Sequence, residues 1–543
     1  MTQFPAMTWA VCRRLFPGHW LDALTTLAVS VSLVIIPSLA FTSLLSAQSI
    51  DRPNILLIMA DDLGFSDLGC YGGEIETPHL DSLAAGGLRY SQFYNTGRCW
   101  PTRGSLLTGY YPQSIRRDTV PGVPSGGRGK RPDWAPLLCT PLREAGYRTY
   151  HTGKWHLDGM PVASGFDHSY YLKDQHRFFN PTLHWKDDKK LPPVPKGTDF
   201  YATVALGDHV LECLQDHAEN HSPKPFFHYL AFAAPHFPLQ ALPADIDKYR
   251  QRYRDGWDAV RRARWQRIES MGLITAPLSD VMPDLGPPYD FPDALKLLGD
   301  GEVNRPFPWD ELTRRQQRFQ ATKMAIHAAM IDCMDRQIGR VVEQLKAMNE
   351  WDNTVIFFLS DNGASAEIMV RGDGHNRDAP MGSWASHLCL GPGWSTVSNT
   401  PFRYHKTWTH EGGTATPLIV HWPAGIDDRG KWRSQVGHVI DLWPTVLQLA
   451  DVDDVGSDGA RPSQTQPSEI QRPGIQRPGI SLVPTFSQHV ATDRTLWWSH
   501  EGNRALRVGD WKISAAGSDG RWELYRTSRD RTETQDLASA HPE

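Results

Sequence analysis

The chain has 543 residues, with 56 lysines and arginines against 61 aspartates and glutamates, which gives a formal net charge of -5. This length allows one large α/β domain and a smaller one, with a core well beyond the marginal size. The near balance of charge gives no reason to expect a nucleic acid as a partner. Seven cysteines are scattered without C-x-x-C pairs, so a disulfide framework does not organise the fold.

The first 48 residues have the pattern of an export signal. Two arginines at positions 13 and 14 precede an apolar run at 27–45, and small residues follow up to Gln48. This order predicts a signal peptide over 1–48, and therefore a periplasmic or secreted protein. An uncleaved membrane anchor is the alternative. Pro37 within the apolar run argues against a stable spanning helix.

The apolar run at 54–60, NILLIMA, is too short for a helix and ends in Asp61 and Asp62. It predicts a strand buried on both faces, as in parallel sheets covered by helices. Carboxylates at the carboxyl end of such a strand stand where the ligand sites of α/β proteins form.

Three further runs show the same pattern of an apolar strand followed by polar residues. They cover 146–152, 226–234 and 355–359, and the residues that follow them include Lys154 and His156, His236, and Asp361 and Asn362. We therefore expect four strands that share one edge. The fold class predicted is α/β, with a large mixed, mostly parallel sheet between layers of helices.

The stretch at 95–109, NTGRCWPTRGSLLTG, places Cys99 two residues before Pro101 and four before Arg103. Proline suits the first turn of a helix, so Cys99 is predicted near a helix N-cap, with Arg103 one turn on along the same face. Helix dipole and arginine together would attract an anion. The alternative is an ordinary buried cysteine before a helix.

The second half of the chain predicts a long helix, an insertion and one more strand. Apolar residues at helical spacing predict a helix over 322–348, whose stripe is core. The segment 241–317 is rich in charge and is predicted to be a solvated insertion that covers the site. Lys406 precedes a Gly412-Gly413 turn and a buried strand at 418–422.

The C-terminal part changes character twice. A helix is predicted over 438–450, and the Pro-rich segment 451–480 has the composition of a linker. Short strands at 495–499, 504–508, 510–514 and 522–525 then predict a small antiparallel subdomain over 481–543.

The sequence C-W-P-T-R-G-S-L-L-T-G around Cys99 resembles the signature of the type I sulfatases, which are arylsulfatase-like members of the alkaline phosphatase-like superfamily. The resemblance continues from Arg52 to about Glu533 and implies a catalytic domain over 52–450. It also implies that a maturation enzyme oxidises Cys99 to formylglycine, whose hydrate is the nucleophile. Family members often have Ser or Ala in place of Thr102, and usually continue with a further C-terminal helix.

The residues Asp61, Asp62, Asp361 and Asn362 offer only oxygen atoms as ligands. Such a set selects a hard divalent cation and suits Ca²⁺ better than Mg²⁺. Without the resemblance, acidic strand ends could equally cap the following helices. The resemblance implies that these four residues and position 99 surround one calcium ion.

The resemblance also assigns roles to the basic residues. Arg103, Lys154 and Lys406 would neutralise the sulfate oxygens. His156 would take the proton when the hydrate returns to the aldehyde, and His236, with Lys406, would protonate the departing alcohol.

The prediction is a sulfuric ester hydrolase that acts on a sulfated small molecule or carbohydrate. Two alternatives stay open: a phosphonate or phosphate ester hydrolase with the same formylglycine site, and a non-catalytic glycan-binding homologue that keeps the Cys99 thiol. The oligomeric state and the position of the sulfate cannot be read from the sequence.

Overall fold

The computed structural model describes residues 52–119, 129–453, 476–491 and 493–542. Residues Ile50–Glu543 form one compact unit. The predicted signal peptide and most of the predicted linker therefore lie outside the described residues. Within the described part of the chain, no helix has the length and apolar character needed to cross a membrane.

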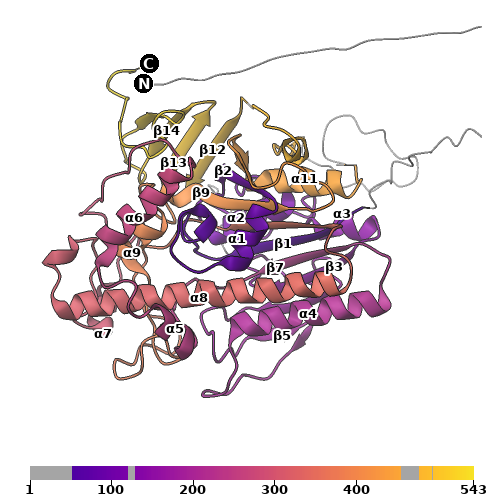
Figure 1. Cartoon of the computed structure of the whole chain (residues 1–543), viewed down its shortest axis with the longest axis horizontal. Helices are drawn as coiled ribbons and strands as arrows, with labels where there is room; N and C mark the ends of the chain where they lie inside the picture. Colours follow the sequence, from indigo (N-terminus) through magenta and orange to yellow (C-terminus); the bar gives the residue numbers. More distant parts are fainter. Residues whose placement is uncertain (1–51, 120–128, 454–475, 492, 543) are drawn as a thin grey trace, which may run out of the picture. The chain divides into compact units, whose positions relative to one another are not determined.

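A large sheet forms the centre of the molecule, in the order β10-β2-β9-β8-β1-β7-β3-β4-β5-β6, with β11 paired to β2 (Figure 1). Strands β8, β1, β7, β3 and β4 run parallel, whereas β9 is antiparallel to both β8 and β2. The mixed, mostly parallel sheet that was predicted is confirmed. The strands are β1 (Asn54–Ala60), β2 (Leu88–Tyr94), β3 (Arg148–Gly153), β4 (His168–Leu172), β5 (His184–Lys186), β6 (Lys189–Lys190), β7 (Phe226–Ala231), β8 (Thr354–Ser360), β9 (Ala415–His421), β10 (Lys431–Arg433) and β11 (Gly437–His438).

Both faces of the sheet are buried, because side chains of β1 alternate between two hydrophobic cores. Leu56 and Ile58 join the core under α1 (Pro78–Ala85), α4 (Ala202–Asn220) and α8 (Arg314–Ala347). Ile55 and Leu57 join the core under α2 (Cys99–Thr108), α3 (Cys139–Glu144) and α11 (Leu442–Leu449). This two-sided burial explains why the strand is a continuous apolar run rather than an alternating one.

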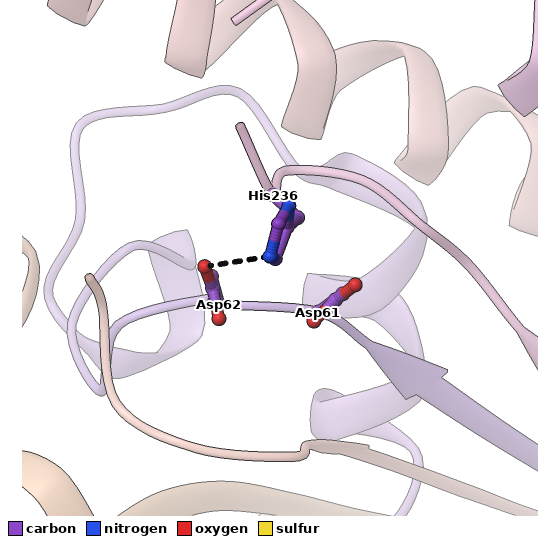
Figure 2. Close-up of side chains that lie close together, drawn as sticks. All are labelled: Asp61, Asp62 and His236. Atoms are coloured by element: carbon purple, nitrogen blue, oxygen red, sulfur yellow. Dashed lines mark ion pairs between the residues drawn. The ribbon is translucent and has the colours of Figure 1, made fainter. Parts of the chain in front are cut away.

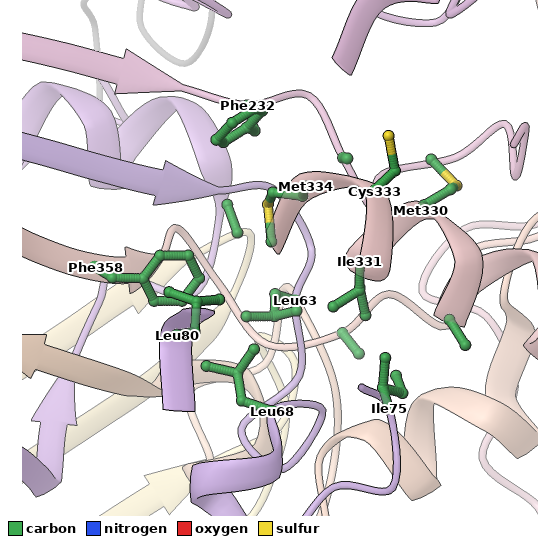
Figure 3. Close-up of a cluster of buried hydrophobic side chains, with 14 of the residues drawn as sticks. Leu63, Leu68, Ile75, Leu80, Phe232, Met330, Ile331, Cys333, Met334 and Phe358 are labelled. Atoms are coloured by element: carbon green, nitrogen blue, oxygen red, sulfur yellow. The ribbon is translucent and has the colours of Figure 1, made fainter. Parts of the chain in front are cut away.

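Helix α8 packs its apolar stripe against the sheet and against α1 (Figure 3). Ile331 and Met334 lie in that core, as the spacing predicted, and Met330 joins them there. The helix starts eight residues earlier than the predicted 322, at Arg314. Thr313 and Gln316 form a capping box at its N-terminus, in which the side chain of each accepts from the backbone amide of the other. The prediction used only the spacing of apolar residues, which does not include this polar pair.

The segment 241–317 contains α5 (Pro243–Tyr249), α6 (Gly256–Ser270), α7 (Pro292–Leu298) and the short helix η3 (Trp309–Glu311). The expectation of a solvated segment is wrong for α6. Its Trp257 packs edge-on against Trp394 of α9 (Gly391–Ser398), and its Arg264 is fully buried. Helical spacing places these two side chains on the face of α6 that meets the core. The many charged residues of the segment gave no indication of this buried face.

Strands β12 (Thr495–His500), β13 (Asn503–Val508), β14 (Trp511–Ala515) and β15 (Glu523–Arg526) form the separate antiparallel sheet that was predicted. Buried Lys512 in β14 bonds to Glu411 at 2.9 Å, which ties this sheet to α10 (Glu411–Thr414). The predicted helix at 438–450 is a short 3-10 turn, η4 (Val439–Asp441), followed by α11. The remaining short helices are η1 (Gly69–Tyr71) and η5 (Val483–Phe486).

Candidate active site

The carboxyl ends of four neighbouring strands bring the predicted polar residues to one edge of the sheet. Strands β8, β1, β7 and β3 are adjacent in that order. Asp361 follows β8, Asp61 follows β1 and Lys154 follows β3 directly, and His236 lies in the loop after β7. The expectation of a shared edge is confirmed, and it follows from the parallel pairing of the strands.

The backbone after two of these strands adopts left-handed angles. Asp62 has φ of 65° and His156 has φ of 57°. Such angles cost free energy in residues other than glycine and gather at functional sites, where the surrounding structure holds them. Here they turn the chain at the edge of the sheet, at the two positions that carry a predicted ligand and a predicted base.

An acidic cluster lies at the end of β1. Oxygens of Asp61 and Asp62 and a ring nitrogen of His236 all lie within 4.8 Å of one another (Figure 2). The Asn362 amide nitrogen donates to Asp62 Oδ1 at 2.7 Å, and the Asp62 amide donates to Asp361 Oδ1 at 3.3 Å. The structure thus connects all four predicted oxygen ligands through Asp62.

Two of these oxygens are buried and have no hydrogen-bond partner in the described structure: Asp61 Oδ1 and Asn362 Oδ1. A buried acceptor without a donor is costly, and a bound cation would satisfy it. Burial and the neighbouring Asp61 raise the pKa of Asp361 to about 6, which a cation would reverse. The residues present therefore fit a hard divalent cation with oxygen ligands.

Three cations face this cluster. Arg103 donates through Nε and Nη2 to Asp361 Oδ2, at 3.0 and 2.7 Å. The Lys154 ammonium bonds to Asp61 Oδ2, and the Lys406 ammonium lies 2.8 Å from Asp62 Oδ1. All three side chains are almost fully buried. The basic residues that were predicted from separate parts of the chain lie together in one site.

Cys99 is the first residue of α2 and is buried, with 3% of its surface exposed. Pro101 occupies the first turn of this helix, as predicted. Burial raises the pKa of the Cys99 thiol, although Lys154 and Lys406 oppose that rise. The unmodified side chain is therefore a protonated thiol at neutral pH and a poor nucleophile.

The two predicted histidines are both held neutral, chiefly by burial. The pKa of His236 falls to about 3, and that of His156 is far below its usual value, with Lys154 and Arg103 adding to the effect. His236 Nδ1 donates to the Phe237 carbonyl, which can only accept, so its Nε2 carries a lone pair. His156 Nδ1 is buried and has no partner in the described structure.

Glu367 is a buried acid that the sequence analysis missed. Its carboxylate accepts from Lys406 Nζ at 3.0 Å, Arg98 Nη2 at 3.1 Å and Ser365 Oγ at 2.8 Å. Burial opposes its ionisation, but Lys406 and Arg98 lower its pKa below the usual range. It follows Asp361 by six residues in a loop, where no periodicity marks it. The sequence indicated this acid only indirectly, because its partner Arg98 is adjacent to Cys99.

The loop contact that brings Lys406 into the site depends on glycine. A Cβ on Gly363 would lie 1.8 Å from the carbonyl oxygen of Gly412. The Gly363 amide donates to the Gly413 carbonyl at 3.0 Å. Close approach of these two backbones therefore joins the Asp361-Asn362 turn to the segment that follows Lys406.

Above this edge of the sheet a cavity of about 390 Å³ opens to solvent. Cys99, His156, His236 and Lys406 lie in its wall. Its outer wall comes from Arg98 and Trp100, which flank Cys99 at the start of α2, and from residues of other segments that no sequence pattern relates to the site: Gln175, Phe237, Tyr289, Phe291, Glu367, Arg371 and Glu501. Tyr289 and Phe291 belong to the segment 241–317, so part of that segment does line the site.

A family model described as Sulfatase matches residues 53–452, well over half of the chain. The chain belongs to the sulfatase family. It is an enzyme that hydrolyses sulfate esters, and the expected resemblance to type I sulfatases is confirmed.

Among its relatives, this sulfatase is 32% identical to an uncharacterized sulfatase of Schizosaccharomyces pombe in an alignment of 535 positions that covers 91% of each chain. It is 32% identical to the arylsulfatase of Klebsiella aerogenes in an alignment of 446 positions that covers 76% of this chain and 89% of the relative. An N-acetylgalactosamine-6-O-sulfatase of Bacteroides thetaiotaomicron is 25% identical, with 92% of each chain covered.

Solved structures share the fold. The structure of Ps i-CgsB in complex with k-i-k-neocarrahexaose has a TM-score of 0.61 at 24% identity and covers 91% of this chain and 90% of its own. A structure in complex with its substrate D-glucosamine-2-N,6-O-disulfate has a TM-score of 0.59 at 21% identity and covers 90% of this chain and 93% of its own.

Proposed function

We propose that this sulfatase hydrolyses a sulfate monoester on a sulfated carbohydrate, with a formylglycine formed from Cys99 and one Ca²⁺ ion. One observation carries the proposal: Cys99, at the N-terminus of α2, shares a cavity wall with His156, His236 and Lys406. Relatives support the carbohydrate, since one is named N-acetylgalactosamine-6-O-sulfatase and one solved structure contains D-glucosamine-2-N,6-O-disulfate.

The metal would be held by the oxygens of Asp61, Asp62, Asp361 and Asn362, together with the modified side chain at position 99. The oxygens Asp61 Oδ1 and Asn362 Oδ1, which are buried and have no hydrogen-bond partner in the described structure, support this ligand set. A bound Ca²⁺ would supply Lewis-acid charge to the sulfate oxygens.

Charge balance supports an anionic substrate. Four carboxylates, Asp61, Asp62, Asp361 and Glu367, are paired in the site with four cations, Arg98, Arg103, Lys154 and Lys406. A divalent cation added to this balanced set would leave the site positive. An anionic ester is the substrate that such a field attracts, and the same field is fixed in advance of the reaction.

Position 99 would provide the attacking oxygen. A hydrated aldehyde there would supply a hydroxyl for attack on sulfur and a second hydroxyl that lets sulfate depart as the aldehyde reforms. The raised pKa of the unmodified thiol supports the need for this oxidation, because a protonated thiol attacks poorly. The oxidation requires a formylglycine-generating maturation enzyme as a partner.

The proton carriers follow from the hydrogen bonds of the free site. Neutral His156, with Nδ1 unpartnered, can accept the proton that position 99 releases. Lys406 carries protons, since Asp62 and Glu367 raise its pKa against the effect of burial. Lys406 is therefore protonated in the free site, and it can give its proton to a departing alkoxide oxygen, which is strongly basic. His236 can assist only after it gains a proton at Nε2, which faces Asp62 Oδ2 at 3.7 Å.

We also propose that the protein is exported, on the support of the basic, apolar and small-residue order in residues 1–48. A membrane anchor in the same segment is the other outcome. Detection of mature protein whose N-terminus lies near Gln48 would distinguish cleavage from retention.

The test compares hydrolysis of 4-nitrophenyl sulfate, 4-nitrophenyl phosphate and a phosphonate monoester by protein matured in a host that performs the oxidation. The proposal expects the highest kcat/KM on the sulfate, and its loss in a Cys99→Ala variant. Higher turnover of phosphate or phosphonate esters would favour the alternative of a phosphonate or phosphate ester hydrolase. Glycan binding without sulfate release, with an intact thiol, would favour the non-catalytic alternative.

A further inference from the structure

Arg371 lies in the wall of the catalytic cavity and is exposed to solvent. It follows β8 by eleven residues, on the loop that also carries Glu367. Its guanidinium carbon lies 5.8 Å from the centroid of the Phe237 ring. Phe237 in turn stacks on His236, with ring centroids 4.1 Å apart. This stack of side chains leads from the acidic cluster out to Arg371.

Arg371 differs from the other two cations of the cavity wall in its partners. Arg98 and Lys406 both bond to Glu367, and Lys406 also bonds to Asp62. Within the described residues, no carboxylate oxygen lies within 4.0 Å of Arg371. The other acid of the wall, Glu501, accepts a hydrogen bond from the Tyr289 hydroxyl at 2.6 Å. Among the described residues of the wall, Arg371 is therefore the cation that has no carboxylate partner.

The side chains beside Arg371 include the neutral ring of His387 and the carboxylate of Asp373, which is paired with Arg177. Burial lowers the pKa of His387 to about 3, and His176 and Arg371 add to the effect. His387 is 4% exposed, and its Nδ1 lies 3.5 Å from the Arg371 amide nitrogen. Its Nε2 is buried and has no partner in the described structure. A neutral ring that accepts at Nδ1 carries its hydrogen at Nε2, so His387 is a buried donor that lies beside Arg371 but outside the wall of the catalytic cavity.

The cation is held on an aromatic ring by contacts that leave its donors available. A guanidinium over an aromatic face is positioned by the ring quadrupole, and its planar edge of N–H groups stays free for oxygen atoms. Sulfate and carboxylate groups match that edge through two parallel hydrogen bonds. The cavity wall thus has cationic groups in two places, Lys406 near Cys99 and Arg371 in the outer wall.

We propose that Arg371 binds a second anionic group of the substrate, a sulfate or a carboxylate, while the ester to be cleaved lies at position 99. The substrate class is then a saccharide with at least two anionic groups. This inference rests on the proposed function and narrows it, because a saccharide with one sulfate would leave Arg371 without a partner.

The experiment measures dissociation constants by calorimetry for pairs of compounds that differ by one anionic group. One pair is D-glucosamine-6-O-sulfate and D-glucosamine-2-N,6-O-disulfate. The other is naphthalene-2-sulfonate and naphthalene-2,6-disulfonate, which contain no ester to hydrolyse. The matured, calcium-loaded protein is expected to bind the doubly charged member of at least one pair about tenfold more tightly, the lower range for a charge-assisted hydrogen bond.

Three variants complete the design. Arg371→Gln is expected to reduce the preference for the doubly charged compound to within about twofold. Arg371→Lys is expected to retain part of it, because the lysine ammonium keeps the charge but not the two parallel donors of the guanidinium. Arg377→Gln is the matched control, since Arg377 is an exposed arginine of the same loop that bonds to the Leu297 carbonyl and lies outside the cavity wall. It is expected to keep the full preference.

The inference is overturned if the unaltered enzyme shows no preference in either pair, or if the preference survives in Arg371→Gln. Failure of the proposed function would look different, because the same protein would then release no sulfate from 4-nitrophenyl sulfate whatever its binding preference. A uniform loss of affinity for both members of a pair in Arg371→Gln would indicate a structural role and would also overturn the inference.

Discussion

Replacement of Lys406 by Met tests the link between the buried ion pairs and the chemistry. Lys406 Nζ lies 2.8 Å from Asp62 Oδ1 and 3.0 Å from Glu367 Oε2, and 2% of its side chain is exposed. Methionine keeps most of the apolar stem but removes the charge. The buried carboxylates of Asp62 and Glu367 would then lose the cation that they share. Removal of one partner of a buried ion pair lowers the free energy of unfolding by about 3–5 kcal/mol. The urea midpoint of unfolding is expected to fall accordingly.

The stability loss can be separated from the loss of activity. In a Lys406→Met, Glu367→Gln double variant one of the two stranded charges is gone, so the double variant is expected to be more stable than the sum of the single effects predicts. Strict additivity of the two free-energy changes would show that Lys406 and Glu367 do not interact in solution.

The activity loss should depend on the leaving group. A sugar alkoxide is strongly basic and needs a proton as it departs, whereas 4-nitrophenolate does not. Loss of a general acid costs about 10²–10⁴-fold, so kcat/KM of Lys406→Met on a sulfated sugar is expected to fall by that factor. The fall on 4-nitrophenyl sulfate is expected to be at least about tenfold smaller. Equal losses on the two substrates would refute the assignment of Lys406 as proton donor.

Four further outcomes follow from the structure. Arg264→Met removes the cation shared by the buried Asp67 and the partly buried Glu74, which keep His327 and Arg267 as ion-pair partners. Urea unfolding should therefore show a loss of about 3 kcal/mol, and a loss below about 1 kcal/mol would contradict it. Burial raises the pKa of Asp335 to about 7. Between about pH 4 and 7 the Asp335 carboxyl is therefore protonated in the folded state but ionised in the unfolded chain. The free energy of unfolding should fall in this range by up to ~1.4 kcal/mol per pH unit as the pH rises. Asp335→Asn should remove that contribution from the pH profile of unfolding, and an unchanged profile would contradict the raised pKa. Tyr289→Phe removes the hydrogen bond to Glu501 at the cavity mouth and should raise KM several-fold with kcat within about twofold, as steady-state kinetics would show. A calcium chelator should abolish activity and lower Tm, and Ca²⁺ should restore both; activity that survives chelation would argue against the metal.

The sequence predicted the central sheet well because its strands carry their own signal. Strand β1 has the predicted bounds, and its apolar run reflects burial on both faces. The acidic and basic residues after β1, β3, β7 and β8 could be grouped because parallel strands end at one edge. Strand β2 was missed, as were the short strands β4, β5, β6, β10 and β11. The residues of β2, LRYSQFY, lose the polar-apolar alternation at Ser91 and Gln92, where the pairing with β9 changes register.

The loops around the site could not be predicted in the same way. Glu367, Arg371, Tyr289 and Glu501 meet at the cavity from three separate segments, and no spacing in the sequence relates them. Their positions depend on tertiary contacts such as the Tyr289–Glu501 hydrogen bond and the contact of Arg371 with Phe237. Likewise, the burial of Arg264 depends on Asp67 and Glu74, which lie far away in the sequence.

The most direct test of the account is the mass of the peptide that contains Cys99. Protein from a host able to carry out the oxidation is digested, and the peptide is measured beside that of protein from a host that lacks it. The first peptide is expected to have lost one sulfur and two hydrogens and gained one oxygen, in proportion to the measured sulfatase activity. A fully active preparation in which residue 99 retains its sulfur would contradict it.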